Sequence, residues 1–226
     1  MRSLWTIAVT LAGIAGIAAP AAAQAPVAVV EDVKGDVPGI EFMDYVAHGR
    51  AIELGPKGSI ILGYMKSCWQ ETIVGGRVIV GFEQSTVYSG NVERTKVACD
   101  AGRIQLTDKE ATQSAATSFR SVEVTHRSAS VEPPITIYGL SPVIETKGIG
   151  KLVIRRLDRN GESREVAVRA NSLVQGKFYD LAKTDTFLAP GGSYLASLGQ
   201  SKAFFKIDSR AKPGSTPIIG RLVRLE

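Results

Sequence analysis

The chain has 226 residues, and 44% of them are hydrophobic, which suffices for the cores of one or two globular domains. It carries 27 lysines and arginines against 22 aspartates and glutamates, without any run rich in basic residues. Mild and dispersed basicity of this kind affects solubility and argues against nucleic acid as a partner.

The chain begins with the pattern of a secretory signal peptide over residues 1–23. Arg2 supplies the positive end of an uncharged, apolar run over residues 4–19. Small residues then predict cleavage after Ala23, in preference to cleavage after Ala25. An uncleaved anchor is the alternative, but the apolar run is shorter than the roughly 20 residues that a bilayer requires. We therefore expect a periplasmic or secreted protein without a membrane span after cleavage.

Cys68 and Cys99 are the only two cysteines. Two cysteines in an exported chain most simply form one disulfide. The closed loop of about 30 residues would contribute roughly 3–4 kcal/mol to stability in the chain-entropy model. Two free thiols are the alternative. A catalytic thiol is disfavoured because no imidazole lies nearby in the sequence to activate it.

Short runs of β-forming residues follow one another from residue 26 onward. The apolar runs at residues 26–30 and 59–64 predict extended or buried strands. Residues 55–58 read Gly-Pro-Lys-Gly and predict a turn. Gly75 and Gly76 predict a tight reversal between the two arms of a hairpin. Further strands are expected at residues 68–74, 77–80, 84–88, 95–99 and 103–106.

One helix is expected over residues 107–119. A threonine and a glutamate three residues later form a capping box at its start, and alanine-rich sequence follows. Residues 128–134 end in Glu-Pro-Pro, which predicts a short, stiff linker. We therefore predict a first β-domain over residues 24–127 and a second domain over residues 135–226.

The second domain is again a series of strands. Asn160 and Gly161 predict a type I′ turn between strands at residues 151–157 and 165–169. Strand lengths and spacings in both domains predict an all-β fold rather than alternating strands and helices. Further strands are expected at residues 135–138, 193–198, 202–207 and 218–225.

Residues 188–194 read Leu-Ala-Pro-Gly-Gly-Ser-Tyr. This stretch resembles the corner that leads into a late strand of immunoglobulin-like and fibronectin type III-like sandwiches, where a tyrosine bonds back to the upstream backbone. The resemblance implies that Tyr194 is the corner tyrosine and Leu188 a core residue. It also implies that residues 135–226 form such a sandwich, without the paired cysteines of antibody domains.

The first domain resembles the FecR family of bacterial periplasmic domains over residues 27–106. The resemblance is carried by V-x-G-x-V at residues 33–37, G-x-x-I at residues 49–52 and L-x-x-x-G-S-x-x-L at residues 54–62. It implies a β-roll that relays signals from an outer-membrane receptor to a cytoplasmic sigma factor. Only three residues precede the apolar run, so we expect no cytoplasmic tail that could hold a sigma factor.

No residue pattern predicts a catalytic centre. His48 and His126 lie outside any metal-binding or nucleophile motif and are expected to be surface residues. Asp180, Asp185 and Asp208 are explained by turn or edge positions, although a glycosidase pair needs only proximity in space. We therefore predict no catalytic, cofactor-binding or metal-binding residues, and no cofactor.

Trp69 is the aromatic residue with two alternative roles. It is expected to pack in the core beside the Cys68–Cys99 disulfide, and the alternative is an exposed platform for a sugar or a peptide. The function predicted from these features is protein–protein interaction, scaffolding or periplasmic sensing in the bacterial envelope, with an unidentified envelope protein as partner. Edge strands would provide the contact. The alternative is an envelope hydrolase or a carbohydrate-binding module, which needs converging catalytic groups or a ligand cleft.

Overall fold

The computed structural model describes residues 25–101, 135–159 and 162–226. Regular structure in these residues is almost entirely β-strand, which confirms the predicted all-β class. The only helical segments described are two short 3₁₀ turns, η1 (Ala170–Ser172) and η2 (Leu181–Thr184). The expected signal peptide, the strand at residues 103–106, the helix at 107–119, the linker and the Asn160-Gly161 turn lie outside the described residues.

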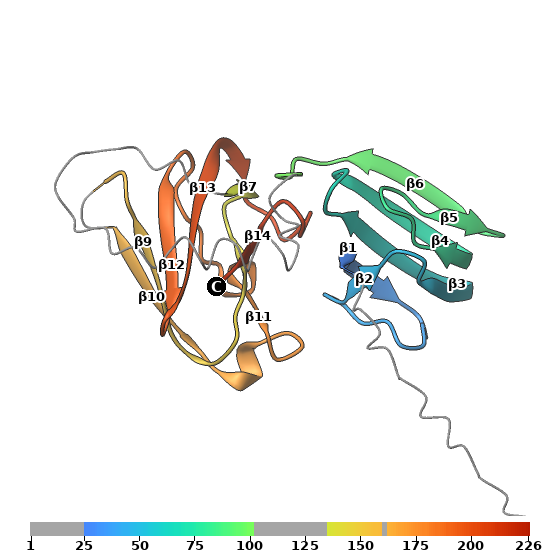
Figure 1. Ribbon diagram of the computed structural model, residues 1–226, viewed down its shortest axis with the longest axis horizontal. Helices are drawn as coiled ribbons and strands as arrows, with labels where there is room; N and C mark the ends of the chain where they lie inside the picture. The colour runs from blue at the N-terminus through green and yellow to red at the C-terminus, as the bar shows by residue number, and fades with distance from the viewer. Residues whose placement is uncertain (1–24, 102–134, 160–161) are drawn as a thin grey trace, which may run out of the picture.

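Residues 25–101, the first half, form one antiparallel sheet in the order β2-β1-β3-β4-β5, and β6 pairs with β4 next to β5 (Figure 1). Its core comes from alternating positions, as on β3, where Ile52, Leu54, Ile60 and Leu62 are buried. The strands are β1 (Pro26–Lys34), β2 (Tyr45–Ala47), β3 (Ala51–Tyr64), β4 (Trp69–Ile79), β5 (Thr86–Tyr88) and β6 (Asn91–Lys96).

The two glycine-rich turns predicted in this half are wrong. Strands β3 and β4 run through residues 55–58 and through Gly75-Gly76, and the true reversal lies between Tyr64 and Trp69. Gly55 pairs with Gly76, and the register of the two strands shifts on both sides of Gly55. Gly55, Gly75 and Gly76 all have positive φ, so these glycines form irregularities in the paired strands that other residues would adopt only with strain.

The predicted disulfide is present. Cys68, in the reversal between β3 and β4, is bonded to Cys99 just after β6, with 5.6 Å between the two Cα atoms. Trp69 is half-buried rather than enclosed: it packs against the core of the first half, and Lys96 Nζ lies 4.8 Å from the centre of its ring. The bridge therefore ties the β3–β4 reversal to the segment that follows the edge strand β6.

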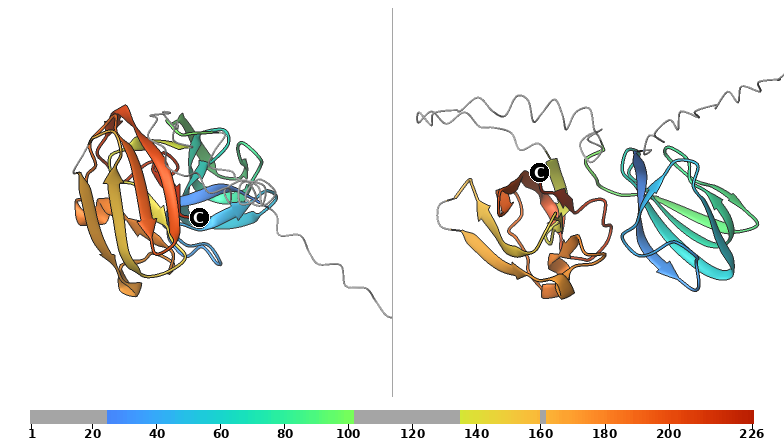
Figure 2. Two further views of the ribbon diagram at one scale, coloured as in Figure 1. Left: turned by 60° about the vertical axis from the view of Figure 1, so that its left-hand side comes forward. Right: turned by 60° about the horizontal axis from the view of Figure 1, so that its bottom comes forward.

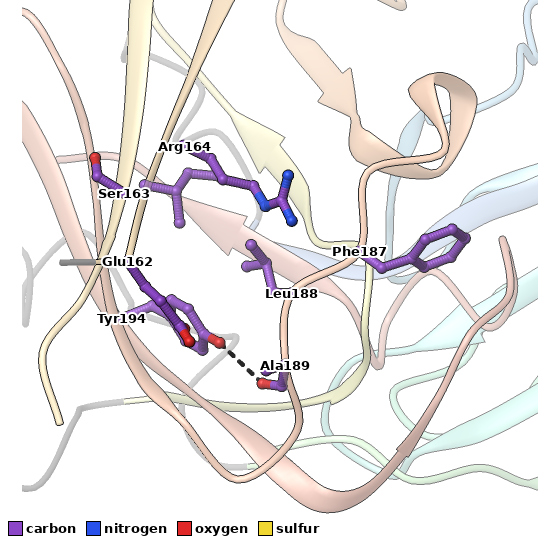
Figure 3. A pocket seen from close by; sticks show the side chains of 8 residues that line it. Glu162, Ser163, Arg164, Phe187, Leu188, Ala189 and Tyr194 are labelled. Carbon is purple, nitrogen blue, oxygen red and sulfur yellow. Dashed lines mark hydrogen bonds between the residues drawn. The ribbon is translucent and has the colours of Figure 1, made fainter. Parts of the chain in front are cut away.

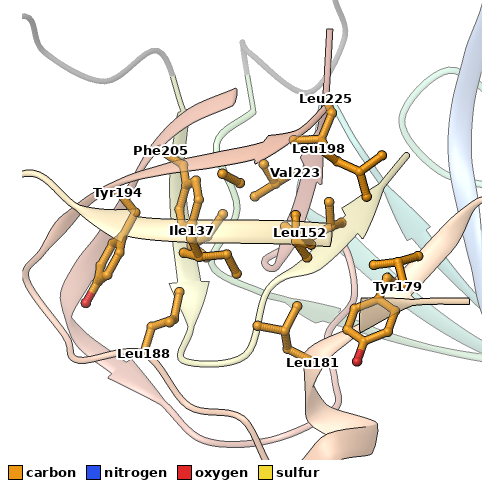
Figure 4. Packing of buried hydrophobic residues seen from close by; sticks show 14 of the residues in the cluster. Ile137, Leu152, Tyr179, Leu181, Leu188, Tyr194, Leu198, Phe205, Val223 and Leu225 are labelled. Carbon is orange, nitrogen blue, oxygen red and sulfur yellow. The ribbon is translucent and has the colours of Figure 1, made fainter. Parts of the chain in front are cut away.

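The second half, within residues 135–226, has two sheets that face each other across one core (Figure 4). Five strands form the sheet β10-β9-β12-β13-β7, and three form the sheet β11-β8-β14. Pairing is antiparallel except for β13 with β7 and β14 with β8. The strands are β7 (Ile135–Gly139), β8 (Val143–Glu145), β9 (Gly150–Arg156), β10 (Ser163–Val168), β11 (Phe178–Asp180), β12 (Ser193–Leu198), β13 (Ser201–Lys212) and β14 (Leu222–Arg224).

The two halves, side by side in Figures 1 and 2, share a buried apolar cluster at their junction. Val29 and Met65 of the first half pack there with Phe178 and Ile219 of the second, and all four are at most 1% exposed. Polar contacts also cross the junction: the Tyr45 hydroxyl donates to Glu145 Oε2 at 2.6 Å. The cluster makes the two halves one packed unit.

A buried carboxylate and a glycine lie in close contact at the junction of the two halves. Glu31 on β1 is 2% exposed and accepts hydrogen bonds from the Ile219 backbone N–H at 2.9 Å and from Gln70 Nε2 at 2.5 Å. Gly63 on β3 lies beside this carboxylate. A Cβ atom at Gly63 would stand 2.5 Å from Glu31 Oε1 and 2.7 Å from Ile219 Cγ2, so a side chain there cannot fit without movement.

Candidate functional site

Strand β10 forms an edge of the second half and is paired only with β9 among the described strands (Figure 1). The Arg156 N–H donates to Glu162 O at 2.9 Å, and the antiparallel register continues from this pair. Even-numbered residues of β10 therefore bond to β9, because bonded and non-bonded pairs alternate. Ser163, Glu165 and Ala167 accordingly direct their N–H and C=O groups away from β9, where another strand can pair.

The inner face of β10 borders an open hollow of about 620 Å³ (Figure 3). Its floor is apolar, since Ile154, Leu188 and Tyr194 are each at most 5% exposed. Its rim carries charged groups and one half-exposed aromatic ring, Phe187. The rim residues are Glu162, Ser163, Arg164 and Phe187.

The hollow exists because the sheets differ in width. The five-stranded sheet faces only three strands, and the segment before β12 covers part of the remaining inner face with Leu188. The Tyr194 hydroxyl fixes this segment by donating to Ala189 O at 2.9 Å, the backward bond expected of a corner tyrosine. Burial raises the pKa of Tyr194, so the hydroxyl keeps its proton as a donor.

Two arginines beside the hollow differ in their partners. Arg156 is 5% exposed and binds Asp158 at 2.8 Å and Glu162 at 3.1 Å. These bonds raise the pKa of the Arg156 guanidinium and lower the pKa of Asp158 to about 2. Arg164 is exposed on the edge strand and extends over the hollow (Figure 3), and no hydrogen bond or ion pair to its guanidinium is found in the described part of the chain. The rim thus combines a neutralised carboxylate with a free cation.

Strand β6, the comparable edge of the first half, has its inward side chains already engaged. Arg94 binds the fully buried Glu71 at 2.7 Å. Lys96 donates to Ser67 O and covers the ring of Trp69. The inward-facing charges of β6 are therefore already paired, whereas the inward-facing Arg164 of β10 is not.

The residues considered for catalysis do not converge. His48 is exposed and stacks on Phe82 with 3.8 Å between ring centres, and His126 lies outside the described residues. Asp180 pairs with the buried Arg221 at 3.0 Å and also caps η2. Asp208 accepts from a neighbouring backbone N–H. Within residues 25–101, 135–159 and 162–226, no group of three His, Cys, Asp or Glu residues could hold a metal ion.

Several charged residues are buried although the sequence does not predict it, among them Glu31, Glu71 and Arg221. Glu31 follows an apolar run on β1 and Glu71 lies on β4, and each looks in the sequence like an ordinary solvent-facing residue. Arg221 is 1% exposed and reads as part of a surface strand. A glycine lies against two of these buried side chains and leaves room for them. Gly63 lies beside Glu31, and Gly139 lies beside the aliphatic part of Arg221.

The fold and these contacts define an all-β protein with one disulfide and two packed halves. Comparison of the chain with protein-family models, with curated proteins and with solved structures gives no match. Among the helical segments that the structure describes, none has the length and apolar character needed to cross a membrane.

Proposed function

We propose that this protein is an exported, non-catalytic binding protein of the bacterial envelope that pairs an extended segment of another protein with strand β10. The observation that carries the proposal is a backbone edge that no other described strand pairs with, next to an apolar hollow. Ser163, Glu165 and Ala167 present outward N–H and C=O groups, and an added strand gains affinity from such main-chain bonds. The hollow gives the same site a means of selecting side chains.

Export is supported by two independent features. Residues 1–23 have the signal-peptide pattern, and the Cys68–Cys99 bridge suits an oxidising compartment. The FecR-like spacing of the first half and the tyrosine corner of the second half are consistent with a periplasmic adaptor. In this proposal the first half positions the second, because the shared apolar cluster joins them.

The contact is tested by photo-crosslinking in intact cells, with a crosslinking amino acid placed at Glu165. A matched chain carries it at Glu93 on β6. We expect one envelope protein to be captured from position 165 and not from position 93. Equal capture from both positions, or capture from neither, would overturn the assignment of β10.

The backbone requirement is tested with two variants of Ala167, whose N–H points away from β9. Ala167→Pro removes this donor without breaking a bond to β9, whereas Ala167→Val keeps it. Capture should fall by about tenfold or more in Ala167→Pro and stay near wild type in Ala167→Val. Matching circular dichroism spectra establish that both variants fold. Unchanged capture by Ala167→Pro, or cell-wall hydrolysis by purified protein that captures nothing, would sink the proposal.

A further inference from the structure

The inner face of the five-stranded sheet is built of rows that run across the strands and stop at β10. One row consists of Leu198, Leu152 and Val166, and all three are apolar. The next row consists of Ala196, Ile154 and Arg164, and it ends in a cation. Any strand added to β10 would extend both rows by one residue, since facing residues of paired strands lie on the same face.

The residues that end the two rows on β10 favour different side chains in an added strand. Val166 is only partly buried and packs against the core of the second half, so an apolar residue opposite it would complete that row. Arg164 is uncommitted, and a carboxylate opposite it would form a charge-assisted and often bidentate pair. In an antiparallel pair with an added strand, Ser163, Glu165 and Ala167 would form the backbone hydrogen bonds. Arg164 and Val166 would then occupy the non-hydrogen-bonded positions, where the side chains of facing residues lie closer together.

We propose that β10 selects an extended partner segment in which an acidic residue, facing Arg164, lies two positions from a large apolar residue that faces Val166. This inference rests on the proposed function and specifies the chemistry of its partner. A basic residue facing Arg164 is rejected, because it would place two like charges directly opposite each other.

Neighbouring charges do not cancel this preference. The Glu162 carboxylate, on the same face as Arg164, is held by Arg156. Glu165 lies on the opposite face of the strand and pairs with Lys151 at 2.5 Å. The uncommitted charge at the edge of the inner face is therefore positive.

The test is selection of random octapeptides from a display library on the purified protein. Enriched peptides should share an acidic residue two positions from a large apolar residue, and Ala167→Pro should abolish their binding. Arg164→Glu should weaken the acidic peptides by about tenfold to a hundredfold, the range for loss of a charge-assisted pair, and should enrich basic residues instead. Arg155→Glu is the matched control, because Arg155 lies on the other face of β9 and carries the same charge change.

The outcomes separate the two proposals. Peptides that depend on Ala167 but show no acidic preference, or equal effects of Arg164→Glu and Arg155→Glu, would overturn the partner chemistry and leave strand addition standing. Peptides that bind Ala167→Pro as tightly as wild type would overturn strand addition itself.

Discussion

Replacing Gly63 with alanine should loosen the junction between the two halves. The new Cβ would lie 2.5 Å from Glu31 Oε1 and 2.7 Å from Ile219 Cγ2, whereas ordinary contacts are 3.4 Å or more. Either the carboxylate or the Ile219 segment must move, and the hydrogen bond between them is strained or lost. Overpacking and loss of a buried hydrogen bond together predict a cost on the order of 2–4 kcal/mol.

Gly148→Ala is the matched control. Gly148 has nothing within 4 Å of the position of its would-be Cβ, and its φ lies outside the left-handed region. Alanine there should be neutral or stabilising by up to about 1 kcal/mol, because it restricts the unfolded chain. The two variants therefore make the same chemical change in a crowded and in an open place.

The assay is urea unfolding followed by two signals. Only Trp5 and Trp69 are tryptophans, so a chain that starts at Gln24 reports the first half through Trp69 fluorescence alone. Far-ultraviolet circular dichroism reports both halves. The transitions should coincide in the wild-type protein and separate in Gly63→Ala. Coincident transitions in Gly63→Ala, at the same midpoint as Gly148→Ala, would refute the reasoning about the junction.

Two further predictions concern Glu31 and the disulfide. Burial raises the pKa of Glu31, although Ile219, Gln70 and the charge of Arg221 act in the opposite direction. Its contribution to stability is thus complete below the unfolded pKa of about 4.3 and is lost as pH rises through the folded pKa, by up to about 1.4 kcal/mol per pH unit. The free energy of unfolding of wild type minus that of Glu31→Gln should fall as the pH rises above about 4, the ordinary pKa of a glutamate, and a flat difference would contradict the raised pKa. Replacing both cysteines with serine should cost about 3–4 kcal/mol for the sequence separation of 31. Wild-type protein denatured without reductant should show no titratable thiol, and two reactive thiols would rule the bridge out.

Local sequence predicted the strand-rich class and the disulfide, but it could not separate a turn from a strand irregularity. Gly55, Gly75 and Gly76 need positive φ in either case, so their chemistry is the same. What distinguishes a turn from an irregular strand is the pairing partner. Gly55 on β3 faces Gly76 on β4, and the chain reverses between these strands at residues 65–68. Because this partner is distant in sequence, the residues next to each glycine do not indicate which residue it pairs with.

The sequence predicted the type of binding site, a strand edge, but not which strand forms it. Sandwich edges were expected to accept a partner strand, but which strand lies at an edge depends on how every other strand pairs. The hollow also needs Leu188 to face Ile154 from a segment more than 30 residues later. Arg164 looks like any exposed charge in the sequence, and only the structure shows that neighbouring carboxylates leave it unpaired.

The contact between Glu31 and Ile219 spans 188 positions of the chain. Strand β1 precedes every other described strand, yet the side of it that carries Glu31 stays uncovered until the segment around Ile219 is available. The parallel pairing of β14 with β8 imposes the same delay on the second half. Contacts so distant along the chain slow folding and prolong the exposure of unpaired strands. We expect maturation to be limited by docking of the segment that carries Ile219 and β14, with chaperones needed most before that step.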